Sequence, residues 1–277
     1  MMEGRPLIFV LVCTIDDGIQ GVPQVLLSEE EGVKYVVSWQ QTQSCGEYPV
    51  ALKRSDVYVA SWNGHGLSRN RNHAMDIAMS KLRDPLEDVV FVIADDDERL
   101  DAQAFPKIRD LYSRQPKLDV ALWRMVDIQD GHLLKEYPVS AISYHRRPRS
   151  YYASSVEMTF RSRLYLMGLR FDERFGLGSE KLSAGEEDVF LTDVLRLGLR
   201  VWIYPKILCS TSSSTTGSFV LDVKVLRSKG AVYGYRHCQL WAFIRSLKEA
   251  FSLAIRYHRS FLFIFRNIWY GVKYIRQ

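Results

Sequence analysis

Apolar runs that alternate with amphipathic stretches constrain the fold of this chain more than any other feature. The run "LIFVLVCTI" at residues 7–15 is a continuous hydrophobic strand of the kind that parallel sheets bury on both faces. Further strands are predicted at 33–41, 56–62 and 88–97, with a helix over 69–82 before the last of them. This βαβα order predicts a mostly parallel, doubly wound α/β sheet.

The same alternation continues in the middle of the chain. It predicts helices over 102–115 and 186–198 and strands over 119–128, 154–165 and 200–205. The last strand is expected to stop at Pro205, because proline cannot donate a ladder hydrogen bond. A length of 277 residues accommodates a catalytic α/β domain over 1–220 and a helical segment over 221–277.

Three adjacent aspartates follow the strand at 88–97, which is the strongest strand signal in the chain. Because strand side chains alternate, Asp95 and Asp97 point to the same side. Hard carboxylate oxygens in that arrangement suit Mg²⁺ or Mn²⁺ held partly by the phosphates of a substrate. An acidic loop or a helix cap is the plain alternative for a D-x-D sequence alone.

Basic residues begin the helix that precedes this strand. Arg69 and Arg71 lie where free backbone N–H groups and the helix dipole already favour anions, and Arg71 is the candidate to contact a diphosphate. A solvated helix face is the alternative interpretation of the same residues.

Three segments in this order and spacing resemble the family-2 inverting glycosyltransferases. They are "GLSRNRNHAMDIA" (66–78), "VIADDDERL" (92–100) and the stretch 171–205 that contains "FDERFGLGS" and "GEEDVF". The resemblance covers residues 7–220 and is greatest for small bacterial members that elongate surface polysaccharides. It implies a GT-A fold and transfer of a sugar, with inversion, from a nucleotide-diphosphate donor such as a UDP-sugar to a glycan or lipid-linked glycan.

The resemblance also implies where the donor binds. Asp97 and Asp95 would hold the Mn²⁺ or Mg²⁺ ion, and Asp95, Asp96 and Arg71 would lie at the donor. The nucleobase and ribose would lie against the ends of the first strands, which nominates Thr14, Asp16, Arg54 and Asp56. The first strand ends in "CTIDDG", whereas members of the family often show a "PxYN"-like sequence there.

On the acceptor side, acids open the helix predicted at 186–198. The helix dipole stabilises acids in a first turn, so a purely structural role is the alternative. The resemblance assigns Asp188, or its neighbour Glu187, as the general base that deprotonates the acceptor hydroxyl. The aromatic and glycine-rich "RFDERFGLGS" is expected to form a platform for a sugar ring.

One departure concerns the metal. Members of the family often carry a histidine shortly after the strand that ends in "YP", but this chain offers Cys209, Ser210 and Thr211 there. Hydroxyl groups are poor metal ligands, so the ion would rely on the aspartates and the diphosphate.

The C-terminal segment carries the positive charge of the chain. Residues 231–277 hold eight Lys/Arg and one acid, whereas the whole chain has a net charge of +5, so residues 1–230 sum to −2. As one helix, residues 240–276 would place basic residues opposite aromatic ones, which predicts contact of residues 241–277 with an anionic membrane surface. Packing of this helix on the catalytic domain is the alternative.

Two other functions remain open at this point. A metal-dependent nucleotidyltransferase would use the same strand-end acids, although the loop "TIDDGIQG" has no basic residue. A non-catalytic protein could bind a membrane or nucleic acid through its basic tail. No nucleic-acid motif appears, however, and we expect no nucleic-acid partner. Widely spaced cysteines and the lack of a signal sequence predict a cytoplasmic protein, peripheral on the inner face of the membrane.

Overall fold

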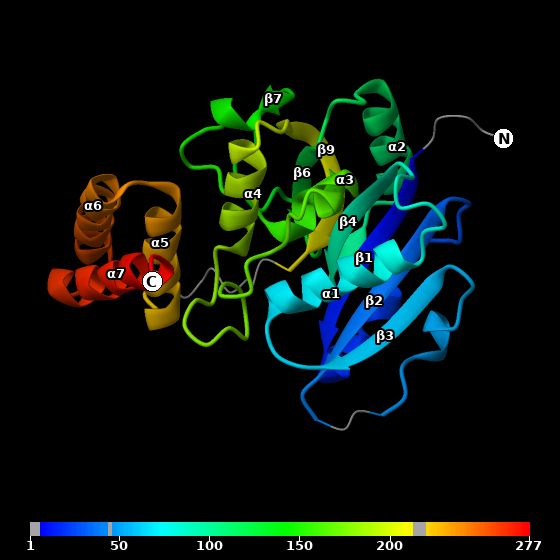
Figure 1. Cartoon of the computed structure of the whole chain (residues 1–277), viewed down its shortest axis with the longest axis horizontal. Coiled ribbons are helices and arrows are strands. Elements are labelled where there is room, and N and C mark those ends of the chain that lie inside the picture. Colours follow the sequence, from blue (N-terminus) through cyan, green and yellow to red (C-terminus); the bar gives the residue numbers. More distant parts are fainter. Residues whose placement is uncertain (1–5, 44–45, 213–219) are drawn as a thin grey trace. The chain divides into compact units, whose positions relative to one another are not determined.

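The computed structural model describes residues 6–43, 46–212 and 220–277 (Figure 1). The chain divides into two compact units. Unit 1 comprises residues 1–65, 70–170 and 193–213, and unit 2 comprises 66–69, 171–192 and 214–277. The sequence predicted a separate C-terminal segment after residue 220. In the structure this segment belongs to the same compact unit as residues 171–192, which include Asp188.

Unit 1 is built on one mixed sheet with the strand order β3-β2-β1-β4-β8-β6-β9-β5, and β7 pairs with β9. Its parallel half consists of β1 (Leu7–Ile15), β2 (Val33–Gln41), β3 (Val57–Asn63) and β4 (Val89–Asp95). These strands lie side by side in Figure 1 and end at a common edge. From Ile8 to Cys13 every residue of β1 is buried, as expected for a strand covered on both faces.

The other half of the sheet brings in antiparallel pairs. It contains β5 (Arg99–Leu100), β6 (Val120–Asp127), β7 (Ile142–Ser143), β8 (Met158–Arg161) and β9 (Val201–Thr211). Strand β8 runs antiparallel to both β4 and β6, whereas β6 and β9 are parallel. The α/β architecture with a parallel half is thus confirmed.

Three helices lie at the predicted places, α1 (Leu67–Ser80), α2 (Ala104–Arg114) and α4 (Glu186–Arg196). The short α3 (Arg163–Leu166) was not predicted. The amphipathic α2 buries Phe105, Ile108 and Leu111 in the core of unit 1.

Three predicted strands differ from the structure. The strand predicted at 88–97 ends at Asp95, and Asp96 and Asp97 lie in a turn, so strand alternation does not decide where the Asp97 side chain points. Only residues 158–161 of the stretch 154–165 form a strand, because the capping box of Ser154 and Glu157 starts a short 3-10 turn before it and α3 follows it. Strand β9 continues past Pro205 to Thr211. The β6–β9 register shifts between the Leu122–Ile203 and Arg124–Ile207 pairs, and this irregularity accommodates the proline.

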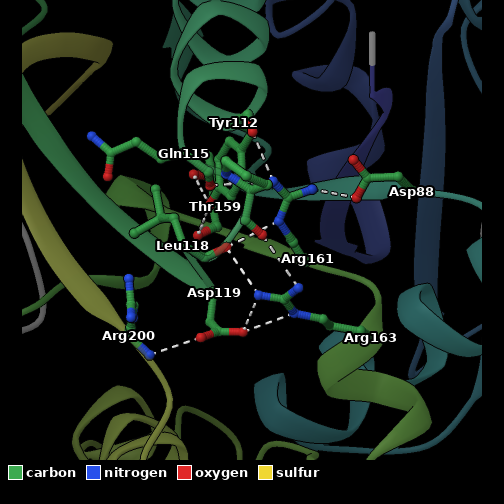
Figure 2. Close-up of polar contacts among 10 residues, drawn as sticks. Asp88, Tyr112, Gln115, Leu118, Asp119, Thr159, Arg161, Arg163 and Arg200 are labelled. Atoms are coloured by element: carbon green, nitrogen blue, oxygen red, sulfur yellow. Dashed lines mark hydrogen bonds and ion pairs between the residues drawn. The ribbon is translucent and has the colours of Figure 1, made fainter. Parts of the chain in front are cut away.

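A buried polar network joins β8 to the amino ends of β4, β6 and β9 and to the carboxyl end of α2 (Figure 2). The Arg161 guanidinium, 4% exposed, donates to the carbonyls of Leu118 and Tyr112 and pairs with Asp88. Asp119 accepts from Arg163 Nε at 2.8 Å and from the Arg200 backbone N–H at 2.7 Å. Because each buried charge has a partner, this network is a structural anchor of unit 1.

Unit 2 ends in three helices, α5 (Val223–Arg236), α6 (Gln239–Tyr257) and α7 (Phe261–Ile275). The prediction of one continuous helix over 240–276 is wrong. His258 adopts a left-handed conformation (φ 52°) and ends α6, and the Ser260 side chain caps α7. Ile268 and Val272 of α7, which a single 240–276 helix would place opposite its basic residues, are buried.

Helices α5 and α7 approach each other backbone to backbone. A Cβ atom at Gly230 would overlap the Ile268 carbonyl, and one at Gly271 would overlap the Arg227 carbonyl. Only glycine fits these two contacts, so both helices are locked in register. No helix among the described residues has the length and apolar character needed to cross a bilayer.

Candidate active site

The carboxyl ends of β1 and β4 carry the first group of candidate residues in unit 1. Thr14 Oγ1 at the end of β1 donates to Asp96 Oδ2 at 2.5 Å. Gln24 Nε2 donates to the Asp96 carbonyl at 3.0 Å, and a Cβ at Gly18 would overlap the Asp96 carboxylate. The Asp96 side chain is therefore folded into the loop after β1.

Asp16 links the carboxyl end of β1 to the carboxyl end of β2. Its carboxylate accepts from the Thr42 backbone N–H at 2.7 Å and from Thr42 Oγ1 at 2.5 Å, and its carbonyl accepts from Trp39 Nε1. Asp16 has a positive φ of 46°, which is uncommon outside glycine and is held here by these three bonds. Thr42 was missed in the sequence, although it directly follows the predicted strand 33–41.

Arg71 is a buried neighbour of Asp95. Its side chain is 1% exposed, and Nη2 lies 2.6 Å from Ser155 Oγ and 3.4 Å from Asp95 Oδ1. Asn70, the preceding residue of α1, donates to the Thr14 carbonyl at 3.0 Å. Arg71 thus orients Asp95, and Asn70 holds the end of β1. Ser155 carried no signal in the sequence, since it lay within a predicted strand.

Four acids in sequence make this edge strongly negative. Burial, with Asp95 and Asp97 nearby, raises the pKa of Asp96 to about 6, although the Thr14 hydrogen bond opposes the rise. Partial burial and the neighbouring Asp95 raise the pKa of Asp97. Glu98 is fully buried, and this burial together with Asp95 raises its pKa well above the usual range. A bound cation would relieve this repulsion.

The residues present fit a hard cation only in part. Over the described ranges 6–43, 46–212 and 220–277, no three His, Cys, Asp or Glu side chains are grouped as a metal site. Asp97 is solvent-accessible and the Asp95 side chain is 33% exposed, whereas Asp96 is engaged by Thr14. Two carboxylates of this kind suit Mg²⁺ or Mn²⁺ that takes its other ligands from phosphates and water.

The structure does not bring Arg54 and Asp56 to this edge. They precede β3, and the Asp56 carbonyl accepts from the Tyr35 backbone N–H near the start of β2. The seven residues of β3 separate them from the carboxyl edge by about 20 Å. Arg54 binds the buried Asp56 through two hydrogen bonds of 2.9 and 2.6 Å, which indicates a structural pair.

In unit 2, the glycine-rich loop after Phe171 is held tightly. Gly176 and Gly178 have φ values of 98° and 78°, and the Leu177 carbonyl accepts from the Leu67 N–H at 2.8 Å. The aromatic residues of this segment are not a platform for a sugar, contrary to the sequence-based expectation. Phe171 is buried and stacks on Phe190 at 4.6 Å, and Phe175 is also fully buried.

The two candidate bases lie in the first turn of α4, where Asp188 is tied to α5. Arg236 Nη2 lies 2.5 Å from Asp188 Oδ1, and the same nitrogen donates to the Asp188 carbonyl at 3.0 Å. Thr192 Oγ1 accepts from Arg236 Nε at 2.9 Å. Glu187 is half-buried. Arg236 was missed because 48 residues separate it from Asp188.

Comparisons with known proteins find likeness in structure and none in sequence. The chain matches no protein-family model and no curated protein. The crystal structure of S. aureus TarS 1-349 matches 91% of this chain and 72% of its own, with a TM-score of 0.58 and 13% identity. This chain has a GT-A fold. At such an identity the likeness is one of fold alone.

Two further TarS structures agree. TarS 1-349 in complex with UDP-GlcNAc matches 91% of this chain and 73% of its own, with a TM-score of 0.54 and 16% identity. The longer TarS structure has a TM-score of 0.54 and 15% identity, and this chain spans 44% of it.

Proposed function

We propose that this chain transfers a sugar from a nucleoside diphosphate, as in a UDP-sugar, to a hydroxyl of a glycan or lipid-linked glycan. The observation that carries the proposal is the crowded acid edge, Asp95 to Glu98, at the carboxyl ends of the parallel strands. Ligands of open α/β sheets bind at that edge. A structural neighbour, TarS, was crystallised with UDP-GlcNAc, which supports a nucleotide-sugar donor.

The donor would lie against unit 1. Thr14, Asp16 and Thr42 shape the edge of β1 and β2 that faces the nucleoside. A Mg²⁺ or Mn²⁺ ion on Asp95 and Asp97 would supply electrostatic stabilisation of the departing diphosphate. Arg71 fixes the orientation of Asp95 from its buried position, so its contribution is made through that carboxylate.

The acceptor would be activated by unit 2. Asp188 accepts the proton of the acceptor hydroxyl as that oxygen bonds to the anomeric carbon. The bond from this carbon to the diphosphate breaks, and the diphosphate leaves with the electron pair. A single displacement inverts the anomeric configuration. Arg236 holds Asp188 by its ion pair, and Glu187 is the alternative base. We place the reaction in bacterial polysaccharide synthesis in the cytoplasm.

Nucleotide binding tests the proposal most directly. Thermal shift and calorimetry with UDP and UDP-sugars, with and without Mn²⁺, should show binding that the ion strengthens. Asp97→Asn should weaken Mn²⁺-dependent donor binding at least tenfold, since it removes one charged ligand. Asp84→Asn, an exposed aspartate elsewhere in unit 1, is the matched control. Absence of any nucleotide binding would refute the proposal, and release of pyrophosphate would favour nucleotidyl transfer.

A further inference from the structure

Helix α6 exposes a row of large apolar side chains on one side. The outer α6 face consists of Leu240, Trp241, Ile244, Phe251 and Ile255. Leu240, Phe251 and Ile255 are each more than 60% exposed, at 66%, 62% and 61%. Positions 240, 244, 251 and 255 follow the helical repeat, so these side chains form one continuous stripe.

This stripe is not needed to hold the three helices together. The opposite side of α6 buries Ala242, Ser246, Ala250 and Leu253. Phe243 packs edge-on against Phe265 and Trp269 of α7, with ring centroids 5.8 and 5.4 Å apart. Among the described residues, α6 therefore packs within its unit mainly through Ala242, Ser246, Ala250, Leu253 and Phe243, and not through the outer α6 face.

Cations accompany the stripe. Arg245, Lys248 and Arg256 are all exposed. At 100° per residue, Arg245 and Arg256 lie along one border of the outer α6 face, and Lys248 lies within it, between Ile255 and Trp241. The single acid of α6, Glu249, pairs with Lys229 of α5 at 2.7 Å. The exposed surface of α6 is thus apolar and positive together.

We propose that the outer α6 face docks on the surface of an anionic lipid bilayer. A stripe of Trp, Phe, Leu and Ile with Lys and Arg within and beside it matches a helix that lies in the membrane interface, with its cations at the lipid phosphates. A second copy of the chain fits less well, because self-pairing of this face would bring its cations together without an acid to balance them. The face differs from the one that a single 240–276 helix predicted.

The docked face lies close to the candidate base. Arg236, which holds Asp188, ends α5, and Leu240 follows it by four residues, so the two lie within about 14 Å. If the proposed function holds, bilayer docking brings Asp188 close to the lipid surface. The acceptor would then be a glycan carried on a membrane lipid, which diffuses in the bilayer to the base.

Flotation of the full chain with vesicles tests the docking without reference to activity. The protein should float with vesicles of phosphatidylglycerol and phosphatidylcholine, less with phosphatidylcholine alone, and less in high salt. Replacing Arg245, Lys248 and Arg256 with Gln together should weaken binding about 100-fold, at about fivefold for each cation near the surface. The matched control replaces Arg83, Lys117 and Arg149, exposed cations of unit 1, and should float like the parent.

The apolar stripe needs its own variant. Trp241→Ser with Phe251→Ser should reduce vesicle binding at least tenfold, whereas Leu86→Ser with Val139→Ser, two exposed positions of unit 1, should not. Circular dichroism melting checks that each variant folds. Equal flotation of the α6 variants and the parent would overturn the proposal. The proposal would also be overturned if the parent protein is a dimer by sedimentation velocity, does not bind vesicles, and dissociates to a monomer in the Trp241→Ser variant. If the parent and these variants bind nucleotides but none binds vesicles, the docking proposal fails while the proposed function stands.

Discussion

The carboxylates of the two units are placed in opposite surroundings. In unit 1, Asp95, Asp97 and Glu98 are crowded together, and burial and like charge raise the pKa values of Asp97 and Glu98. In unit 2, Asp188 faces a guanidinium at 2.5 Å. The first group has an excess of negative charge that a cation can relieve, whereas the second already has its counter-ion. The contrast supports the proposed roles of Asp95 and Asp97 as a metal and diphosphate site and of Asp188 as a positioned base.

Asp188→Asn gives the largest expected effect on the acceptor side of this contrast. Loss of the base should lower kcat for sugar transfer by about 10²–10⁴-fold, while UDP binding measured by calorimetry stays unchanged. Glu187→Gln, a neutral substitution in the same turn, is the control and should cost far less. The reverse order of the two variants would move the base to Glu187.

Arg236→Gln tests whether the counter-ion positions the base. We expect kcat to fall about tenfold with an unchanged donor KM, because the Asp188 carboxylate loses its fixed orientation. Arg236→Lys retains the charge and should recover part of the rate. A loss of rate that follows the loss of thermal stability in both variants would assign Arg236 a structural role only.

Gly18→Ala sharpens the unit 1 side. The new Cβ would overlap the Asp96 carboxylate and crowd Thr14 Oγ1, so the Thr14–Asp96 hydrogen bond should break. Loss of one buried hydrogen bond costs about 1 kcal/mol, and donor affinity should fall about fivefold. Calorimetry with UDP measures this affinity, and Gly46→Ala is the control, because a Cβ there meets no atom of the described residues.

Arg54→Gln has the smallest expected effect on function. It leaves the buried Asp56 carboxylate without its partly exposed partner, so the free energy of unfolding should fall by about 1–3 kcal/mol. Donor affinity should not change, because the pair lies at the amino ends of the strands. A loss of UDP affinity in calorimetry would return Arg54 to the donor site.

Local patterns predicted most of unit 1. The bounds of β1 and β2 match the apolar runs to the residue, because strands buried on both faces carry an unbroken signal. The continuation of β9 past Pro205 depends on its register with β6, which no local pattern encodes. The position of Arg54 could have been recognised, since it precedes a predicted strand and therefore lies at the amino edge.

Contacts between distant segments account for the rest. The pairing of Asp188 with Arg236 and the position of Ser155 under Arg71 depend on tertiary structure. The break between α6 and α7 rests on a left-handed His258, a conformation that only weak sequence signals favour. A single helix without that break placed the exposed Phe251 on the same face as the buried Ile268 and Val272.

The glycine contacts between α5 and α7 have a mechanical consequence. At Gly230 and Gly271 the backbones of the two helices touch without an intervening side chain, so neither helix can slide along the other. A force applied to these two helices should therefore rotate them as one rigid body, with Arg236 at the end of α5. The ion pair between Arg236 and Asp188 would then depend on the orientation of that body.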